Sequence, residues 1–120
     1  MEERVPASLR DPEGNWFGMS KRIRAFFVDR GKPAPAGLAR YEDLAKPEFR
    51  GMVLTRSSSN IYSIGWTAAM IAANGVEATE AWARGLVANL ARPPTGGDSD
   101  QIRAMAAGQG AIGIANTYYW

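Results

Sequence analysis

Residues 52–74, MVLTRSSSNIYSIGWTAAMIAAN, change from a strand pattern to a helix pattern within a few positions. Residues 52–56 are a short, largely apolar run typical of a buried strand, and the polar SSSN that follows supplies helix caps. A strand that leads directly into a helix is the unit from which α/β sheets with crossover connections are built. The spacing of three and four residues places the apolar helix face at Ile61, Ile64, Ala68, Ile71 and Ala72.

The rest of the chain continues this alternation of strands and helices. Asp98, followed three residues later by Gln101, is predicted to open a helix as a capping box. The flanking segments are predicted as tail and turn (1–15), a long, partly buried strand (16–28), a short helix (41–45), two further helices (76–91 and 98–107) and a buried strand (111–116).

Composition bounds the chain to one soluble domain at most. It has 120 residues, a hydrophobic content of 46% and a net charge of +2, with neither cysteine nor histidine. Without these two residue types, a bound metal must be held by oxygen atoms. The basic charge is compatible with an anionic ligand but lies far below that of a nucleic-acid-binding module. The sequence shows no export signal, and no membrane insertion is expected.

Two predicted strands end in polar segments that place tyrosines together. In open α/β sheets, ligands bind beyond the carboxyl ends of the strands. Tyr62 follows one such end, and Tyr118 and Tyr119 follow the other. Three of the four tyrosines are therefore expected at one edge of the sheet, whereas Tyr41 is interpreted as a packing residue.

Clustered phenols indicate a hard, highly charged cation. A phenol has a pKa of about 10 and stays neutral at neutral pH unless a strong positive charge favours the phenolate. Ferric iron provides such a charge and prefers anionic oxygen over sulfur. Tyr118 and Tyr119 can both reach one ion only if the backbone leaves extended geometry there, because neighbouring side chains of a strand point to opposite faces. Aromatic packing of the two rings is the alternative interpretation.

The serine-rich turn is a second candidate site. Unpaired amide hydrogens at the start of the helix, three serine hydroxyls and Arg56 are together predicted to form an anion pocket. A small anion there could complete the coordination of the metal or neutralise local charge. In the alternative interpretation, Ser58 or Ser59 is simply the N-cap of the helix.

These motifs resemble the ferric-iron-binding proteins of bacterial ABC transporters, in their tyrosine-rich subgroup. The segments that carry the resemblance are LRDPEGNWFGMSKRIRAFFV, YEDLAKPEFRGMV, RSSSNIYS and WARGLVANLARPPTGGDSDQIRAMAAGQGAIGIANTYYW. The resemblance implies an α/β fold, as one incomplete lobe of a type-2 periplasmic-binding-protein fold with a mixed sheet flanked by helices. It implies that 1–15 is a tail, that 16–28 is a crossover between lobes, and that 29–120 is a second lobe truncated at its C-terminal side.

The same resemblance implies a function. It implies that Tyr62, Tyr118 and Tyr119 hold Fe³⁺ as phenolates in an inter-lobe cleft. Less firmly, it implies that Arg56, Ser57, Ser58 and Asn60 line the cleft or hold a companion anion such as carbonate or phosphate. The partner of such a receptor is an ABC transporter permease, and its location is the periplasm. The family is longer than this chain, so an internal fragment without the first lobe is expected.

Three other interpretations stay open from the residues. One is a lobe that binds a different small anion or an organic cation. Another is an enzyme acting on phosphate esters, which is disfavoured because no nucleophile–base pair is found, so that no catalysis is expected. The third is a truncated fragment without a function, whose missing strands would expose a sheet edge.

Overall fold

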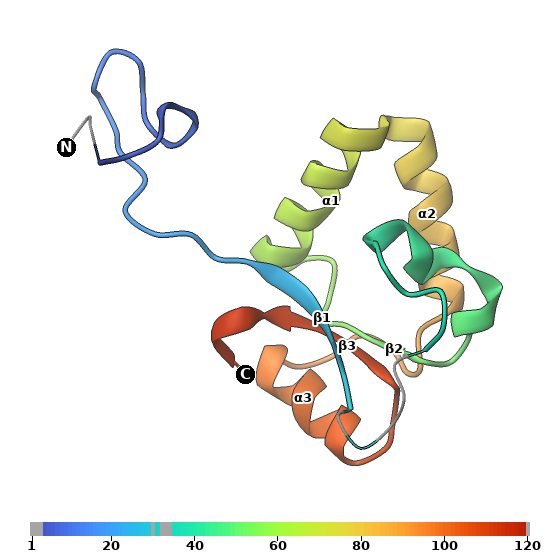
Figure 1. Cartoon of the computed structure of the whole chain (residues 1–120). Coiled ribbons are helices and arrows are strands. Elements are labelled where there is room, and N and C mark those ends of the chain that lie inside the picture. Colours follow the sequence, from blue (N-terminus) through green and yellow to red (C-terminus); the bar gives the residue numbers. More distant parts are fainter. Residues whose placement is uncertain (1–3, 30, 32–34, 120) are drawn as a thin grey trace.

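The structure is a computed structural model that describes residues 4–29, 31 and 35–119. It contains three strands and three α-helices, together with short 3₁₀ helices (Figure 1). Of the helices in this part of the chain, none is long and apolar enough to cross a membrane. The elements in chain order are η1 (Ala7–Leu9), β1 (Arg24–Val28), η2 (Tyr41–Ala45), η3 (Pro47–Phe49), β2 (Val53–Leu54), α1 (Ile61–Asn74), α2 (Val76–Ala88), α3 (Asp98–Ala106), β3 (Ile112–Asn116) and η4 (Thr117–Tyr119).

The three strands form a mixed sheet in the order β1-β3-β2. β3 is the central strand and is buried along its whole length. It pairs antiparallel with β1, from Arg24 opposite Asn116 to Val28 opposite Ile112, and parallel with β2. The expectation of an α/β fold with a mixed sheet flanked by helices is confirmed.

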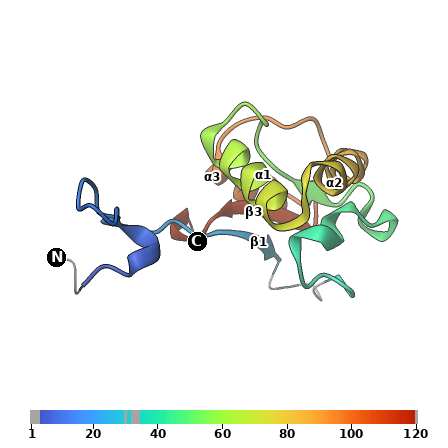
Figure 2. The same ribbon diagram turned by 90° about the horizontal axis from the view of Figure 1, so that it is seen from above.

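Helices cover both faces of this sheet, with α1 and α2 on one side and α3 on the other (Figure 1). Alternation along the strands explains the two layers, because successive side chains point to opposite faces. Phe26 and Ile114 pack into the core beneath α1 and α2, whereas Phe27 and Leu54 pack against Met105 of α3. The segment before β1 extends away from this body (Figures 1 and 2).

The buried face of α1 differs from the predicted one. Ser63, Trp66 and Met70 are buried, whereas Ile61 and Ile64 are 69% and 50% exposed. Both sets have helical spacing, because α1 is apolar on most sides, so spacing alone does not choose between them. The choice is made by aromatic packing: the Trp66 ring lies 5.2 Å from that of Tyr41 and 4.9 Å from that of Trp82, centroid to centroid. The packing role expected for Tyr41 is confirmed.

The predicted strand at 16–28 is too long. Only residues 24–28 form β1, because β3 offers five residues for pairing and Arg24 already lies opposite the last of them, Asn116. Beyond Asn116 the chain turns into η4, so the residues before Arg24 lack a continuing neighbour strand in the described structure. The predicted strand at 52–56 is likewise shortened to β2. The role of 16–28 as a crossover between lobes stays a prediction.

The predicted capping box of α3 is wrong by one residue. Gly97 is the N-cap, and its amide donates to the Asp100 carboxylate at 2.7 Å. Asp98 is the first helical residue, and its carboxylate turns inward to the sheet. Gln101 is also buried, where its side-chain amide donates to the carbonyl oxygens of Thr95 and Gly97. The prediction failed because Asp98 is bonded to β1 and β3 and is not available to cap its own helix.

Candidate metal centre

The tyrosines of the site come from two elements at one edge of the sheet. Tyr62 is the second residue of α1, and the Asn60 side chain caps this helix by accepting the Tyr62 amide at 3.0 Å. Tyr118 and Tyr119 lie in η4, which follows β3 directly. β2 and β3 run parallel, so the segments that follow them leave the sheet at the same edge. Because η4 is a 3₁₀ turn, the backbone at Tyr118 and Tyr119 is not extended, and the two adjacent side chains need not point to opposite faces.

The three rings converge. The hydroxyl oxygens of Tyr118 and Tyr62 lie 3.2 Å apart, within hydrogen-bonding distance. The ring of Tyr119 packs against that of Tyr118 with centroids 4.6 Å apart and an angle of 37° between the planes. The Asn116 side-chain amide donates to the Tyr118 hydroxyl at 3.1 Å. Tyr118 and Tyr119 are 52% and 40% exposed, so the cluster is open to a ligand from solvent.

The cluster sets the order in which its phenols ionise. The pKa of Tyr118 lies below its usual value, because the Tyr62 hydroxyl and then the Asn116 amide donate hydrogen bonds to the Tyr118 phenolate. The pKa values of Tyr62 and Tyr119 are raised, chiefly because each donates to Tyr118 and then meets its negative charge. Tyr118 therefore ionises more easily than an isolated tyrosine, and Tyr62 and Tyr119 ionise less easily unless an additional positive charge lies nearby.

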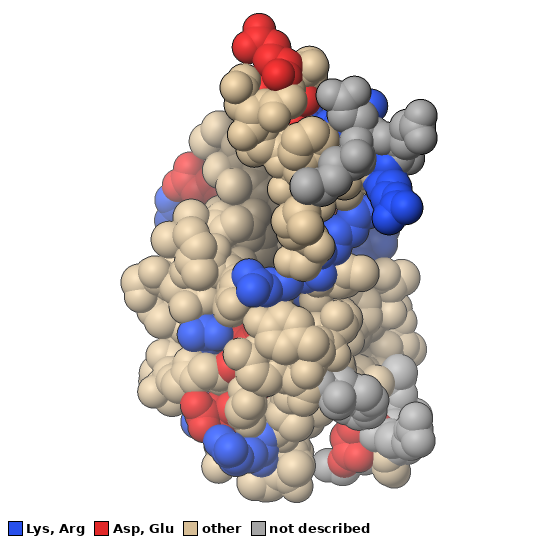
Figure 3. Space-filling model, turned by 90° about the vertical axis from the view of Figure 1, so that its left-hand side faces the viewer, with Lys and Arg blue, Asp and Glu red and all other residues tan. Residues whose placement is uncertain are grey.

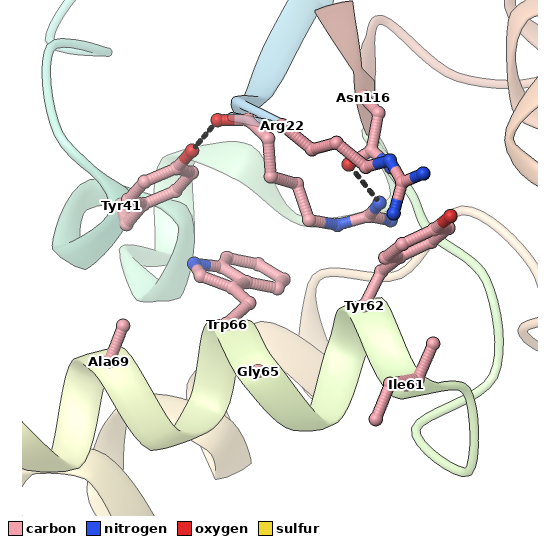
Figure 4. A pocket seen from close by; sticks show the side chains of 9 residues that line it. Arg22, Tyr41, Ile61, Tyr62, Gly65, Trp66, Ala69 and Asn116 are labelled. Carbon is pink, nitrogen blue, oxygen red and sulfur yellow. Dashed lines mark hydrogen bonds between the residues drawn. The ribbon is translucent and has the colours of Figure 1, made fainter. Parts of the chain in front are cut away.

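Guanidinium groups surround Tyr62. The central carbons of Arg24 and Arg56 lie 5.9 and 5.5 Å from the centre of its ring. Arg22 lines a cavity of 340 Å³ beside this ring, in which Tyr62 and Trp66 project from α1 toward Asn116 (Figure 4). Figure 3 shows basic side chains across the middle of the face that lies on the left-hand side of Figure 1. The site therefore combines a cluster of phenols with permanent positive charge.

A buried carboxylate ties these groups together. Asp98 is 1% exposed, and its two oxygens accept hydrogen bonds from Arg24 at 3.0 and 3.2 Å and from Arg56 at 3.3 Å. Asp98 also accepts a hydrogen bond of 2.8 Å from the backbone amide of Asn116. Burial opposes the ionisation of Asp98, but these donors outweigh it and leave its pKa below the usual value. Sequence reasoning missed the roles of Asp98 and Arg24, because Asp98 has the pattern of a helix cap and Arg24 is one of several basic residues on a partly buried strand.

The residues predicted to hold an anion are only partly brought together. Arg56 reaches the ring of Tyr62, as described above. Ser57 and Ser58 stay exposed on the turn, where the Ser57 hydroxyl bonds to that of Ser59 at 2.9 Å. Asn60, and not Ser58 or Ser59, caps α1. A role for these residues in holding an anion stays a prediction.

Tyrosine oxygens are the candidate metal ligands here. No cluster of three or more Asp, Glu, His or Cys side chains that could hold a metal occurs among the described residues. The phenol oxygens of Tyr62 and Tyr118 instead lie close together, and the ring of Tyr119 packs beside that of Tyr118. These tyrosines lie on rigid supports, a capped helix and the end of the central strand.

Comparison with known proteins gives relatives along the whole chain. A family model for bacterial extracellular solute-binding proteins matches residues 2–120. Iron uptake protein A2 from Synechocystis sp. is 48% identical over 120 residues, which are 100% of this chain and 35% of that protein. The chain therefore spans about a third of the length of this relative.

Solved structures share the fold. A Trichodesmium protein (IdiA, FutA) in complex with iron and citrate ligands is 50% identical, with a TM-score of 0.89 over 96% of this chain and 36% of that one. The ferric binding protein from Campylobacter jejuni is 40% identical, with a TM-score of 0.90 over 96% of this chain and 37% of that one. The chain belongs to the family of bacterial extracellular solute-binding proteins.

Proposed function

We propose that this chain supplies the phenolate ligands Tyr62, Tyr118 and Tyr119 of a ferric-ion site in the substrate receptor of a bacterial iron importer. The observation that carries the proposal is the convergence of the three rings, with the Tyr62 and Tyr118 oxygens 3.2 Å apart. The names of the relatives support it, since one is an iron uptake protein and another holds iron and citrate.

The chemistry of the cluster selects a trivalent ion. Three ionised phenols side by side repel one another, as the raised pKa values of Tyr62 and Tyr119 reflect. An ion of charge +3 neutralises three phenolates, and ferric iron is the hard acid that prefers such oxygens. Soft metals would prefer sulfur or imidazole, and the chain has neither cysteine nor histidine.

The rest of the function belongs to a longer receptor. Because the chain spans about a third of its relatives, the other side of the coordination sphere would come from another part of such a receptor. In a two-lobed protein the ion would lie in the cleft between lobes, and closure of the cleft would present a surface to an ABC transporter permease. The location is then the periplasm, and no catalysis is expected.

A companion anion fits the charge around the phenols. Arg22, Arg24 and Arg56 carry three positive charges near the site, and Asp98 neutralises one of them. The remaining surplus favours an anion such as carbonate, phosphate or citrate beside the ion.

A titration with ferric citrate tests the ligand set. The folded chain should develop a visible phenolate-to-iron charge-transfer band, and a Tyr118→Phe/Tyr119→Phe variant should lose it. The matched control is Tyr41→Phe, whose hydroxyl bonds to the Arg24 carbonyl oxygen outside the cluster, so the band should remain. A folded wild-type chain without the band, or a double variant that keeps it, contradicts the proposal.

The second candidate is a lobe that binds a small anion without iron. The 340 Å³ cavity with Arg22 and Arg24 in its lining favours this over an organic cation, which the arginines would repel. Thermal unfolding in the presence of phosphate or citrate, with and without ferric ion, separates the two. Stabilisation by the anion alone, equal to that by the ferric complex, supports the second candidate.

A further inference from the structure

We propose that Asp98 is the positioning residue of the tyrosine site: it holds two arginines against Tyr62 and orients Asn116 toward Tyr118. The inference rests on the ferric-ion function proposed above and adds a residue that touches none of the three phenols. Its evidence is a set of hydrogen bonds that run from one buried carboxylate to both halves of the tyrosine cluster.

The first observation is where the hydrogen bonds of Asp98 go. Its side chain is fully shielded from solvent, and the four bonds described for it all end on Arg24, Arg56 and Asn116. A carboxylate that only served to stabilise α3 would accept amides of its own helix, as Asp100 does. Asp98 instead joins the first turn of α3 to the ends of β1 and β3.

One branch leads to Tyr62. Arg24 and Arg56 are both bonded to Asp98, and both lie over the ring of Tyr62 within 6 Å of its centre, at 5.9 and 5.5 Å. A long arginine side chain loses much rotamer freedom when it is fixed, and an exposed one would not stay in one position. The side chains of Arg24 and Arg56 are only 9% and 17% exposed, so the carboxylate holds them where they bear on Tyr62.

The other branch leads to Tyr118. Asp98 fixes the backbone of Asn116 through its amide, and Arg24 donates to the Asn116 side-chain oxygen at 3.2 Å. Because that oxygen faces a guanidinium, the amide nitrogen of Asn116 faces the other way and donates to Tyr118 at 3.1 Å. A donor at this point fixes the position of the Tyr118 hydroxyl oxygen, the atom that would contact the ion.

Charge is the property that the site needs from Asp98. Asparagine has almost the same shape, but it would leave two buried guanidinium groups without an anion and would place hydrogen-bond donors where acceptors are needed. The arginines would then move toward solvent or toward another anion. Tyr62 and Asn116 would lose the contacts that orient them.

The test compares Asp98→Asn with Asp43→Asn in the same 120-residue chain. Asp43 is the matched control because it is also buried and also accepts backbone amides, those of Ala39 and Arg40, but it lies in η2 away from the tyrosines. Near-ultraviolet circular dichroism establishes that each variant is folded. Ferric citrate is the probe, and both the affinity and the charge-transfer band are recorded.

Asp98→Asn should bind ferric ion roughly 10- to 100-fold more weakly than the wild type, as is usual when a residue that orients metal ligands is lost. Its charge-transfer band should also shift or weaken at saturation, whereas Asp43→Asn should keep both the affinity and the band. A band that is unchanged at saturation, together with wild-type affinity in folded Asp98→Asn, overturns the proposal. A wild-type chain without any band overturns the ferric-ion function and not the positioning role alone.

Arg56→Gln keeps the proposal testable if Asp98→Asn does not fold. Arg56 is the less buried of the two arginines and has one of the four bonds to Asp98, so its loss leaves the Arg24 branch in place. The expected change is in the same direction but smaller, on the order of a few-fold to tenfold in affinity. A folded Arg56→Gln chain with wild-type affinity and band contradicts the Tyr62 branch.

Discussion

Replacement of Gly85 by alanine should destabilise the chain, although alanine is the better helix former. Gly85 lies in the last turn of α2, where it faces η2. A methyl group at this position would lie 2.7 Å from the Ala45 side-chain carbon and 2.8 Å from the Ala45 carbonyl oxygen. Carbon atoms in ordinary contact are about 3.5–4.0 Å apart, so α2 would have to move away from η2 by on the order of 1 Å.

The contacts on either side of Gly85 resist this movement. Trp82 donates its indole N–H to the Tyr41 carbonyl oxygen at 2.8 Å, and Asn89 donates to the Leu44 carbonyl oxygen at 2.8 Å. Overpacking costs about 1–3 kcal/mol, and weakening these two hydrogen bonds adds about 1 kcal/mol each. The gain in helix propensity returns about 1 kcal/mol. The net loss in the free energy of unfolding is therefore about 2–4 kcal/mol.

Gly65→Ala is the matched control, because Gly65 is also in a helix interior, in α1, and nothing lies within 4 Å of the added methyl group. It should raise the free energy of unfolding by up to about 1 kcal/mol, through helix propensity alone. Urea unfolding followed by circular dichroism measures both variants. If Gly85→Ala is as stable as the wild type, or if both variants shift in the same direction, the close contact of α2 with η2 does not limit the size of the side chain at position 85.

Three further predictions address the core, the pH dependence and the phenols. Met70→Ala should lower the free energy of unfolding by about 2–5 kcal/mol, whereas Ile64→Ala on the exposed side of α1 should cost under about 1 kcal/mol. Urea unfolding would show the larger loss for Ile64→Ala if the apolar face predicted from the sequence were the buried one. The pKa of Asp43 is held below its usual range by Lys46 and by the Ala39 and Arg40 amides. Its stabilising effect is therefore present above about pH 4 and lost as the pH falls toward the folded pKa, so the urea midpoint should drop in acid for the wild type and less for Asp43→Asn. In an absorbance titration of the four tyrosines, one should ionise below about pH 10 and three above it, Tyr41 among the late ones because its burial raises its pKa. Tyr118→Phe should move Tyr62 and Tyr119 back toward that value, because Tyr118 is the main cause of both shifts. A titration of Tyr118→Phe in which all three late steps are unchanged would contradict the hydrogen-bonded cluster.

Local patterns predicted the elements of the fold and failed where tertiary packing decides. The helix at 61–74 has the predicted ends because its signals are local, an Asn60 cap and a glycine at its C-terminus. Its buried face was wrong because helical spacing gives two answers for an apolar helix, and the answer depends on rings from η2 and α2. The strand at 16–28 was too long because the length of β1 is set by β3, a partner more than 80 residues away in the sequence.

The candidate site also contains residues that local patterns could predict and residues that they could not. Tyr62, Tyr118 and Tyr119 could be placed together from the sequence, since topology alone brings the ends of parallel strands to one edge. The Asp98–Arg24 pair could not, because it joins residues 74 positions apart, and each has a plausible local role as a helix cap or as a charge on a strand. A buried ion pair is stable only when the fold places its two partners correctly, and neither partner can be recognised from the residues next to it in the sequence. For the proposed phenolate site, the groups that position the tyrosines are therefore the ones that sequence patterns reveal last, and mutation of Asp98 is a sharper test of how the site works than mutation of any tyrosine.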